Sequence, residues 1–199
     1  RFGQALPLCR LQLEQPAEKR SQVLSVEHKS GRSGDLVFVT VEHEVWQGGV
    51  RALREEHDIV YKNPSPVQAQ KPHNPTTPPD PGQWQRQCRP DSTLLFRYSA
   101  LTFNGHRIHY DRSYVTQHEG YPGLVVHGPL IATLLVDVLR RNTDRTLKKF
   151  EFKAVRPSFE CADGRAIKLM AQTKDNSHVT LWAQDHEAYL TMQATAELN

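Results

Sequence analysis

Cysteine is scarce in this sequence. The three cysteines, Cys9, Cys88 and Cys161, are an odd number and lie far apart. No C-x-x-C pair occurs, so the sequence indicates neither a disulfide framework nor a cysteine-based zinc site. We therefore expect a reducing compartment. The expected location is the cytoplasm, or the mitochondrion if the source is eukaryotic.

Long hydrophobic runs are also missing. No stretch reaches the roughly 18 consecutive apolar residues of a membrane helix, so we expect no membrane partner. The first residues, RFGQALPLCR, lack the apolar core of a signal peptide. Because the chain does not begin with Met, a targeting segment before Arg1 stays an open possibility.

A strong charge of either sign is absent as well. The 25 Lys and Arg residues and 22 Asp and Glu residues give a net charge of +3. Basic and acidic residues alternate, as in LREEHD, whereas nucleic-acid binders usually gather Lys and Arg on one face. We therefore expect no nucleic-acid partner. The 199 residues suffice for one large domain or for two domains of about 100 residues each.

The N-terminal part, residues 1–62, has the pattern of a β-meander. Its first 20 residues are polar and irregular, and an alternating half-buried strand around Leu24–His28 follows. The β-branched run Leu36–Trp46 predicts a second strand, and Val50–Tyr61 a third. The turn-type sequences SGRSGD and QGG separate these strands.

A proline-rich linker is predicted at residues 63–90, where eight of the 13 prolines lie. Proline lacks a backbone N–H and fits neither a helix interior nor a central strand. So many prolines predict a long extended connection. The linker separates residues 1–62 from a C-terminal domain at residues 91–199.

The C-terminal domain is predicted to contain one long helix and several strands. The helix, Gly128–Arg141, is apolar on both faces, so we expect it to be buried nearly all round. A short strand at Thr93–Tyr98 precedes it, and residues 99–120 are mostly loop with one helical turn at Asp111–Tyr114. Four strands are predicted after the helix: Lys148–Val155, Arg165–Gln172, Val179–Gln184 and Tyr189–Glu197.

One buried helix with an antiparallel meander around it is the hot-dog layout, an α+β fold. The N-terminal half has the meander without such a helix. We therefore predict a double hot-dog whose N-terminal member is incomplete in this chain. Its helix has either degenerated or lies before Arg1.

Two short motifs, NGHRIH at Asn104–His109 and VVHGPL at Val125–Leu130, lie in the histidine-rich segment Phe96–Arg141. The sequence RYSALTFNGHRIHYD followed by GYPGLVVHGPL resembles the MaoC-like, or hydratase-2, family. It is most similar to the branch of mesaconyl-C4-CoA and itaconyl-CoA hydratases and mitochondrial-type 3-hydroxyacyl-thioester dehydratases. The resemblance is specific over residues 94–141 and looser over 20–62 and 147–197.

The resemblance implies a hydro-lyase that adds water reversibly, with syn stereochemistry, to a 2-enoyl-CoA. A dicarboxylic or branched substrate such as mesaconyl-C4-CoA or itaconyl-CoA is expected. One alternative is a 3-hydroxyacyl-[acyl-carrier-protein] dehydratase of type II fatty acid synthesis, and another is a non-catalytic acyl-thioester-binding hot-dog module. The expected partner is an acyl-CoA. We expect a homo-oligomer, a dimer or larger, with no cofactor and no metal.

Three residues are the predicted catalytic groups. Adding water to an enoyl thioester needs a group that holds or deprotonates the water, a proton for C2 and a donor for the thioester oxygen. His109 can accept and donate a proton near neutral pH, and Asn104 can hold the same water. Gly128 can offer its backbone N–H at a helix N-terminus. The broad family has a carboxylate in place of Asn104, which leaves proton transfer mainly to His109.

Further residues of the segment are candidates for substrate binding. Arg107 could pair with a substrate carboxylate, or with Asp111 at the surface. His127 fits a structural role better than direct contact. The full set of candidates is Tyr98, His106, Arg107, Asp111 and His127.

Two other chemistries stay open. The histidines of the segment, together with Asp111, include enough ligands for a metal ion, but their spacing matches no common site and Arg107 would oppose a cation. A hot-dog thioesterase usually needs a carboxylate beside the thioester. The best candidate for it, Asp137, is predicted to lie deep in the helix.

Overall fold

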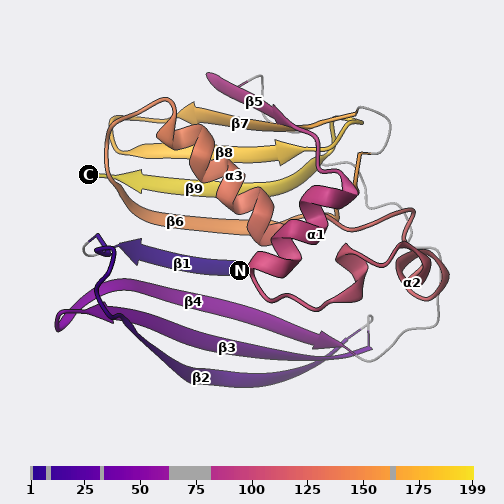
Figure 1. Ribbon diagram of the computed structural model, residues 1–199, viewed down its shortest axis with the longest axis horizontal. Coiled ribbons are helices and arrows are strands. Elements are labelled where there is room, and N and C mark those ends of the chain that lie inside the picture. The colour runs from indigo at the N-terminus through magenta and orange to yellow at the C-terminus, as the bar shows by residue number, and fades with distance from the viewer. Residues whose placement is uncertain (1, 8–9, 32–33, 63–81, 162–164) are drawn as a thin grey trace.

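The computed structural model describes residues 2–7, 10–31, 34–62, 82–161 and 165–199. One antiparallel sheet of nine strands runs through it (Figure 1), in the order β2-β3-β4-β1-β6-β9-β8-β7-β5. The strands are β1 (Phe2–Pro7), β2 (Glu18–Gly31), β3 (Gly34–Gln47), β4 (Val50–Lys62), β5 (Trp84–Cys88), β6 (Leu147–Ala154), β7 (Ile167–Thr173), β8 (His178–Gln184) and β9 (Leu190–Leu198). The helices are α1 (Ser92–Leu101), the 3-10 turn η1 (Arg107–His109), α2 (Arg112–Gln117) and α3 (Gly128–Arg140). In these ranges, no helix is long and apolar enough to cross a membrane.

Strands β2, β3 and β4 confirm the predicted N-terminal meander. Gly48 and Gly49 form the tight turn between β3 and β4 with positive φ angles of 58° and 78°, a conformation that glycine adopts without strain. The alternation in β2 does not make it half-buried, because Leu24 and Val26 are exposed. The reason is position: β2 is the edge strand of the sheet, and no described helix lies over it (Figure 1).

Two segments predicted to be irregular are strands instead. Phe2–Pro7 forms β1 between β4 and β6, so it joins the two halves into one sheet. Trp84–Cys88, inside the predicted linker, forms edge strand β5 on β7. Strand β5 has a local reason, because it occupies the proline-free stretch between Pro81 and Pro90. Strand β1 depends instead on its pairing with the distant strands β4 and β6. Most of the remaining linker, residues 63–81, lies outside the described residues.

Helix α3 is the centre of the C-terminal half, and it packs across β5, β7, β8 and β9 (Figure 1). Leu135 is fully buried, and Val138 and Leu139 are almost so. Thr133 is exposed on the opposite side, so the helix is buried on most of its circumference but not all round. The four predicted strands after the helix are confirmed within about two residues. This arrangement is the predicted α+β hot-dog, and within the described residues only the C-terminal half has its helix.

The short strand predicted at Thr93–Tyr98 is wrong, because these residues belong to helix α1. Asp91 caps this helix: its side chain accepts a hydrogen bond from the backbone N–H of Leu94 at 2.7 Å. Leu95 and Ser99, four residues apart, are both buried against the rest of the domain. The aromatic residues of the segment suggested a strand, whereas the cap and the four-residue spacing favour a helix.

The cap of α1 provides a test of this correction. Asp91→Ala should lower the free energy of unfolding by about 1 kcal/mol, because an N–H of the first turn loses its acceptor. Asp91→Asn keeps an acceptor oxygen and should retain most of the stability. Urea unfolding followed by circular dichroism measures both. Equal losses for the two variants would contradict the capping role.

Candidate active site

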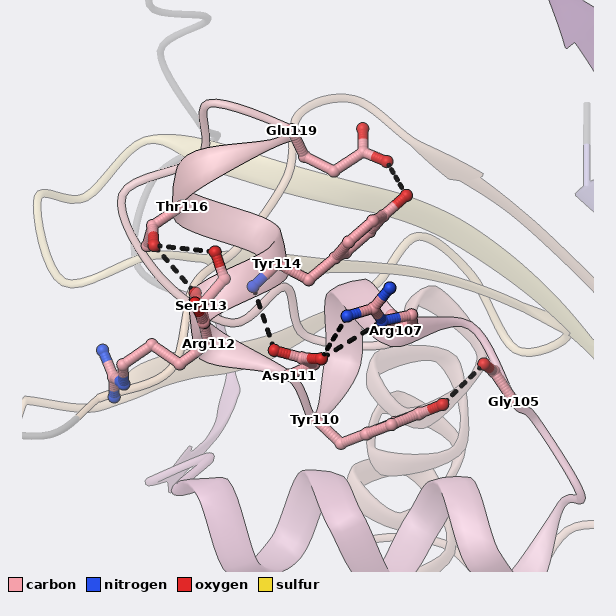
Figure 2. Close-up of polar contacts among 9 residues, drawn as sticks. All are labelled: Gly105, Arg107, Tyr110, Asp111, Arg112, Ser113, Tyr114, Thr116 and Glu119. Atoms are coloured by element: carbon pink, nitrogen blue, oxygen red, sulfur yellow. Dashed lines mark hydrogen bonds and ion pairs between the residues drawn. The ribbon is translucent and has the colours of Figure 1, made fainter.

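The loop that leads to His109 is held by its own polar side chains. Figure 2 shows Arg107 donating two hydrogen bonds to Asp111, at 3.1 and 2.7 Å. Asp111 also caps α2 by accepting from the backbone N–H of Tyr114 at 2.9 Å. The Tyr110 hydroxyl donates to the carbonyl of Gly105 at 2.8 Å and so closes the turn from the other side. These contacts fix η1, and His109 is its last residue.

His109 is buried, with 8% of its surface exposed, and its ring is fixed by one hydrogen bond. Its Nδ1 lies 2.7 Å from the carbonyl oxygen of Val125. A carbonyl can only accept, so Nδ1 carries the proton and the neutral ring presents an unprotonated Nε2. Burial lowers the pKa of His109 from its ordinary value, the hydrogen bond to Val125 partly opposes this, and the neighbouring His106 lowers the pKa further. The ring is therefore prepared to act as a base at Nε2.

His127 lies flat against His109, with 3.7 Å between the ring centroids and 15° between the planes. It is 1% exposed, and its Nε2 shares a hydrogen bond of 2.8 Å with the hydroxyl of Ser99. Its Nδ1 is buried and has no hydrogen-bond partner. Burial, followed by the proximity of His109, lowers the pKa of His127 to about 4. His127 is therefore neutral at physiological pH and gives His109 an apolar face to stack on.

Gly128 is the first residue of α3, where backbone N–H groups have no partner within the helix and the helix dipole favours negative charge. A Cβ at this position would meet only the Met192 methyl group, at 3.9 Å, which is ordinary van der Waals contact. The packing of the fold therefore does not require glycine here. Any requirement for glycine would come from a molecule that approaches the helix N-terminus.

Two cavities meet at His109 and Gly128, which line both. The larger one, of about 900 Å³, lies between α3, β6 and residues 55–60 of β4. Its walls are mostly apolar and include Ile59, Phe150 and Phe152. The smaller one, of about 290 Å³, lies between the start of α3 and residues 154–158. A substrate that extends in two directions from the reacting atoms has a place for each part.

The other predicted site residues lie at different distances from these cavities. His106 lines the larger cavity, and its ring meets that of His109 edge-on at 5.7 Å. Asn104 uses its side-chain oxygen to accept from the backbone N–H of His106 at 3.0 Å. Tyr98 packs edge-on against His127 at 4.8 Å, and burial raises its pKa. Arg107 and Asp111 are paired with each other. The lining of the two cavities includes none of Asn104, Tyr98, Arg107, Asp111 and His127.

Several residues at the site were not predicted from the sequence. Ser99 holds His127, and Arg156 and Ser158 line the smaller cavity. Glu55, His57 and Asp58 of the N-terminal half face the larger cavity. Only Ser99 had a local signal, because it lies one turn after Leu95 on the same face of α1. The others reach the site through the pairing of distant strands.

Comparison with known proteins places the chain in a family. The sequence profile described as "Hydroxyacyl-thioester dehydratase type 2" matches residues 3–160. The chain belongs to this family. The resemblance to the MaoC-like family inferred from the two motifs is thereby confirmed.

Individual relatives agree with this family. The chain is 44% identical over 189 residues to the mesaconyl-C(4)-CoA hydratase of Chloroflexus aurantiacus, covering 94% of this chain and 65% of that protein. It is 41% identical over 73 residues to the mitochondrial hydroxyacyl-thioester dehydratase type 2 of Schizosaccharomyces pombe, covering 35% of this chain and 24% of that protein. The chain thus spans less than two thirds of either relative.

The fold is shared with solved structures. A MaoC-like dehydratase from Phytophthora capsici superposes with a TM-score of 0.75 at 12% sequence identity, over 99% of this chain and 70% of that one. At this identity the likeness concerns the fold alone. It confirms the predicted hot-dog architecture.

Asp137, the carboxylate considered for a thioesterase, lines neither of the two cavities. Asp137 is half-exposed near the C-terminal end of α3, where it pairs with Arg86 and Arg141. As predicted, it lies well inside the helix, nine residues after Gly128. Its side chain occupies the side of α3 that meets solvent and these arginines. Among the described residues, no three His, Cys, Asp or Glu side chains are placed to hold a metal ion.

The depressed pKa of His127 has a consequence for stability. The unfolded chain binds a proton at this residue below about pH 6.5, whereas the folded protein does so only near its pKa of about 4. The unfolded state then binds more protons, so stability falls as the pH falls. His127 should account for a loss of about 2 kcal/mol between pH 7.5 and pH 5.

Urea unfolding at pH 7.5 and pH 5 tests this expectation. His127→Gln cannot titrate and should show a smaller difference between the two pH values than the wild type. His186→Gln, which removes an exposed histidine, is the matched control and should keep the wild-type difference. An unchanged pH difference in His127→Gln would contradict the buried neutral state of His127.

Proposed function

We propose that the chain is a hydratase/dehydratase that acts on a 2-enoyl or 3-hydroxyacyl thioester of coenzyme A. The observation that supports this most directly is the pairing of two groups at the meeting point of the cavities. One is the unprotonated Nε2 of His109, and the other is the backbone N–H at Gly128. A base and an oxyanion donor that border the same space are what water addition to an enoyl thioester requires.

The hydration step uses these groups as follows. His109 Nε2 takes a proton from a water molecule as the water oxygen bonds to C3. The electron pair of the double bond shifts toward the thioester carbonyl, whose oxygen becomes negative and is stabilised by the N–H at Gly128. The proton then passes from Nε2 to C2, on the same face, which gives syn addition. Dehydration is the reverse sequence.

Asn104 is proposed to assist by positioning the water. Its side-chain oxygen is used by the backbone N–H of His106, so its amide NH₂ is the group left to contact a water. An amide cannot take a proton near neutral pH, so this role is binding only. The hydrogen bond from the His106 N–H to Asn104 also stabilises the loop. Because neither role includes proton transfer, a substitution of Asn104 should lower kcat/KM less than one of His109.

The substrate is proposed to be a short dicarboxylic or branched acyl-CoA. The 44% identity to the Chloroflexus mesaconyl-C(4)-CoA hydratase over 94% of this chain supports this choice. A dehydratase acting on acyl-carrier-protein thioesters is the second candidate, favoured by the shorter match to the mitochondrial dehydratase. Both candidates use the same chemistry at His109 and Gly128. The enzyme is proposed to act as a homo-oligomer.

The first test of this function concerns His109. His109→Ala should lower kcat/KM for hydration at least about 100-fold, the usual contribution of a general base. Mesaconyl-C4-CoA, itaconyl-CoA and crotonyl-CoA form the substrate panel, and loss of the enoyl-thioester absorbance measures the rate. His118→Ala is a matched control, because His118 is exposed and lines neither cavity.

The outcomes of this panel separate the alternatives. Equal rates for wild type and His109→Ala would overturn the role of His109. Binding of CoA thioesters without turnover, in both proteins, would instead support a non-catalytic module. Release of free thiol, measured in parallel, would indicate a thioesterase.

A second test concerns Gly128. A Cβ there meets only Met192 at 3.9 Å, so Gly128→Ala should leave the thermal unfolding temperature within a few degrees of wild type. The same methyl group would project toward the thioester and displace its oxygen from the helix N-terminus. We expect a loss of about tenfold or more in kcat, in line with a weakened oxyanion contact. Full activity in a stable Gly128→Ala protein would show that the substrate does not approach this N–H.

A further inference from the structure

The smaller cavity contains a buried hydroxyl group with no partner. Ser158 is 2% exposed, and its Oγ makes no hydrogen bond. Buried polar groups are nearly always hydrogen-bonded, so the Ser158 hydroxyl, which lines a cavity without a partner, is available to bind a molecule that enters it. The backbone carbonyl oxygen of Ser158 accepts a hydrogen bond from the backbone N–H of Val126 at 2.8 Å. This bond holds Ser158 beside the His127–Gly128 segment.

Arg156 lines the same cavity and is held at its edge. Its guanidinium lies over the ring of Tyr189, 4.6 Å from the centroid, and its backbone N–H donates to the carbonyl of Thr191. The ion pair with Asp185 is loose, at 3.8 Å. Asp185 itself is buried and accepts from the backbone N–H groups of Glu187 and Tyr189. The guanidinium therefore keeps donors available for a further acceptor.

The charges of the two cavities differ in sign. The described lining of the smaller cavity includes Arg156 and no Asp or Glu. The described lining of the larger cavity includes Glu55 and Asp58, together with histidines, and no Lys or Arg. A carboxylate on the substrate is attracted to the smaller cavity and repelled from the larger one. The larger, mostly apolar cavity suits the long pantetheine arm of coenzyme A.

Size points the same way. A cavity of about 290 Å³ is at the lower end of small-molecule sites, which range over about 300–1,000 Å³. It accommodates an acyl group of a few carbons and not a long chain. Because His109 and Gly128 line it, such a group would have its double bond beside both catalytic groups.

We propose that the smaller cavity is the acyl subsite, and that Arg156 and Ser158 bind a carboxylate attached to the acyl group near its double bond. Arg156 supplies a charge-assisted hydrogen bond to this carboxylate, and the Ser158 hydroxyl donates a second one. This assignment rests on the proposed function and defines its substrate class. It also places the carboxylate away from Arg107, which is exposed and already bound to Asp111 (Figure 2).

The test compares a substrate with a carboxylate and one without. Mesaconyl-C4-CoA has its free carboxylate on the carbon that receives water, and crotonyl-CoA has a hydrogen there. The readout is the ratio of their kcat/KM values. Arg156→Gln should lower this ratio about 10- to 100-fold, and Ser158→Ala by a smaller factor, since neutral donors contribute less. Arg156→Lys keeps the positive charge, so its ratio should lie between those of Arg156→Gln and the wild type.

Arg20→Gln is the matched control. Arg20 makes the same kinds of contact, because it stacks on Trp46 at 5.0 Å and pairs with Glu18, but it lies on β2 and lines neither cavity. The ratio of kcat/KM values for the two substrates should be the same in Arg20→Gln as in the wild type. Circular dichroism and urea unfolding of each variant show whether a change reflects folding.

The outcomes distinguish this proposal from the proposed function. If a folded Arg156→Gln protein loses kcat/KM equally for both substrates, the subsite assignment is overturned. Arg156 would then bind the CoA part, which both substrates share. If the wild type hydrates neither thioester, the proposed function fails, and calorimetric binding decides the subsite. Wild type should then bind mesaconyl-C4-CoA more tightly than crotonyl-CoA, and Arg156→Gln should abolish the difference. Equal binding by the wild type would overturn the proposal.

Discussion

The site depends on one hydrogen bond, from His109 Nδ1 to the carbonyl of Val125. This bond fixes which nitrogen of the ring is free, and it joins the η1 loop to the segment before α3. That segment is in turn tied to residues 156–160 through Val126 and Ser158. His127 supports the same ring by stacking. The base, the helix N-terminus and the small cavity thus share one set of backbone contacts, and each is positioned by the others.

Sequence patterns predicted the parts of this arrangement that depend on local periodicity. Helix α3 and the strands around it follow from their apolar spacing, and the two histidine motifs located the junction of the cavities. Helix α1 was missed although Asp91 offers a capping side chain, because its aromatic residues favoured a strand. Strand β1 has no local signal of its place: its position between β4 and β6 depends on pairing across about 50 and 150 residues.

The charges in the two cavities were equally hidden from the sequence. Arg156 and Ser158 follow β6, whereas Glu55 and Asp58 belong to a strand of the other half. Nothing in the spacing of these residues indicates that they face a common reaction centre. Arg107, which stood within a motif, was the more visible candidate for a carboxylate ligand, and the structure pairs it with Asp111. Proximity in sequence to a candidate catalytic residue was therefore a weaker guide to the residues that line the cavities than position on the sheet.

Strand β1 has a consequence for ligand binding. Within the described residues, it is the strand through which the sheet continues from β4 to β6. A molecule that fills the larger cavity contacts β4 on one wall and α3 and β6 on the other. Such a molecule binds only when both halves are docked, and by mass action it must favour their docking. The proposed acyl-CoA substrate would therefore hold the two halves together in addition to β1, and the stability of their association would rise with substrate concentration.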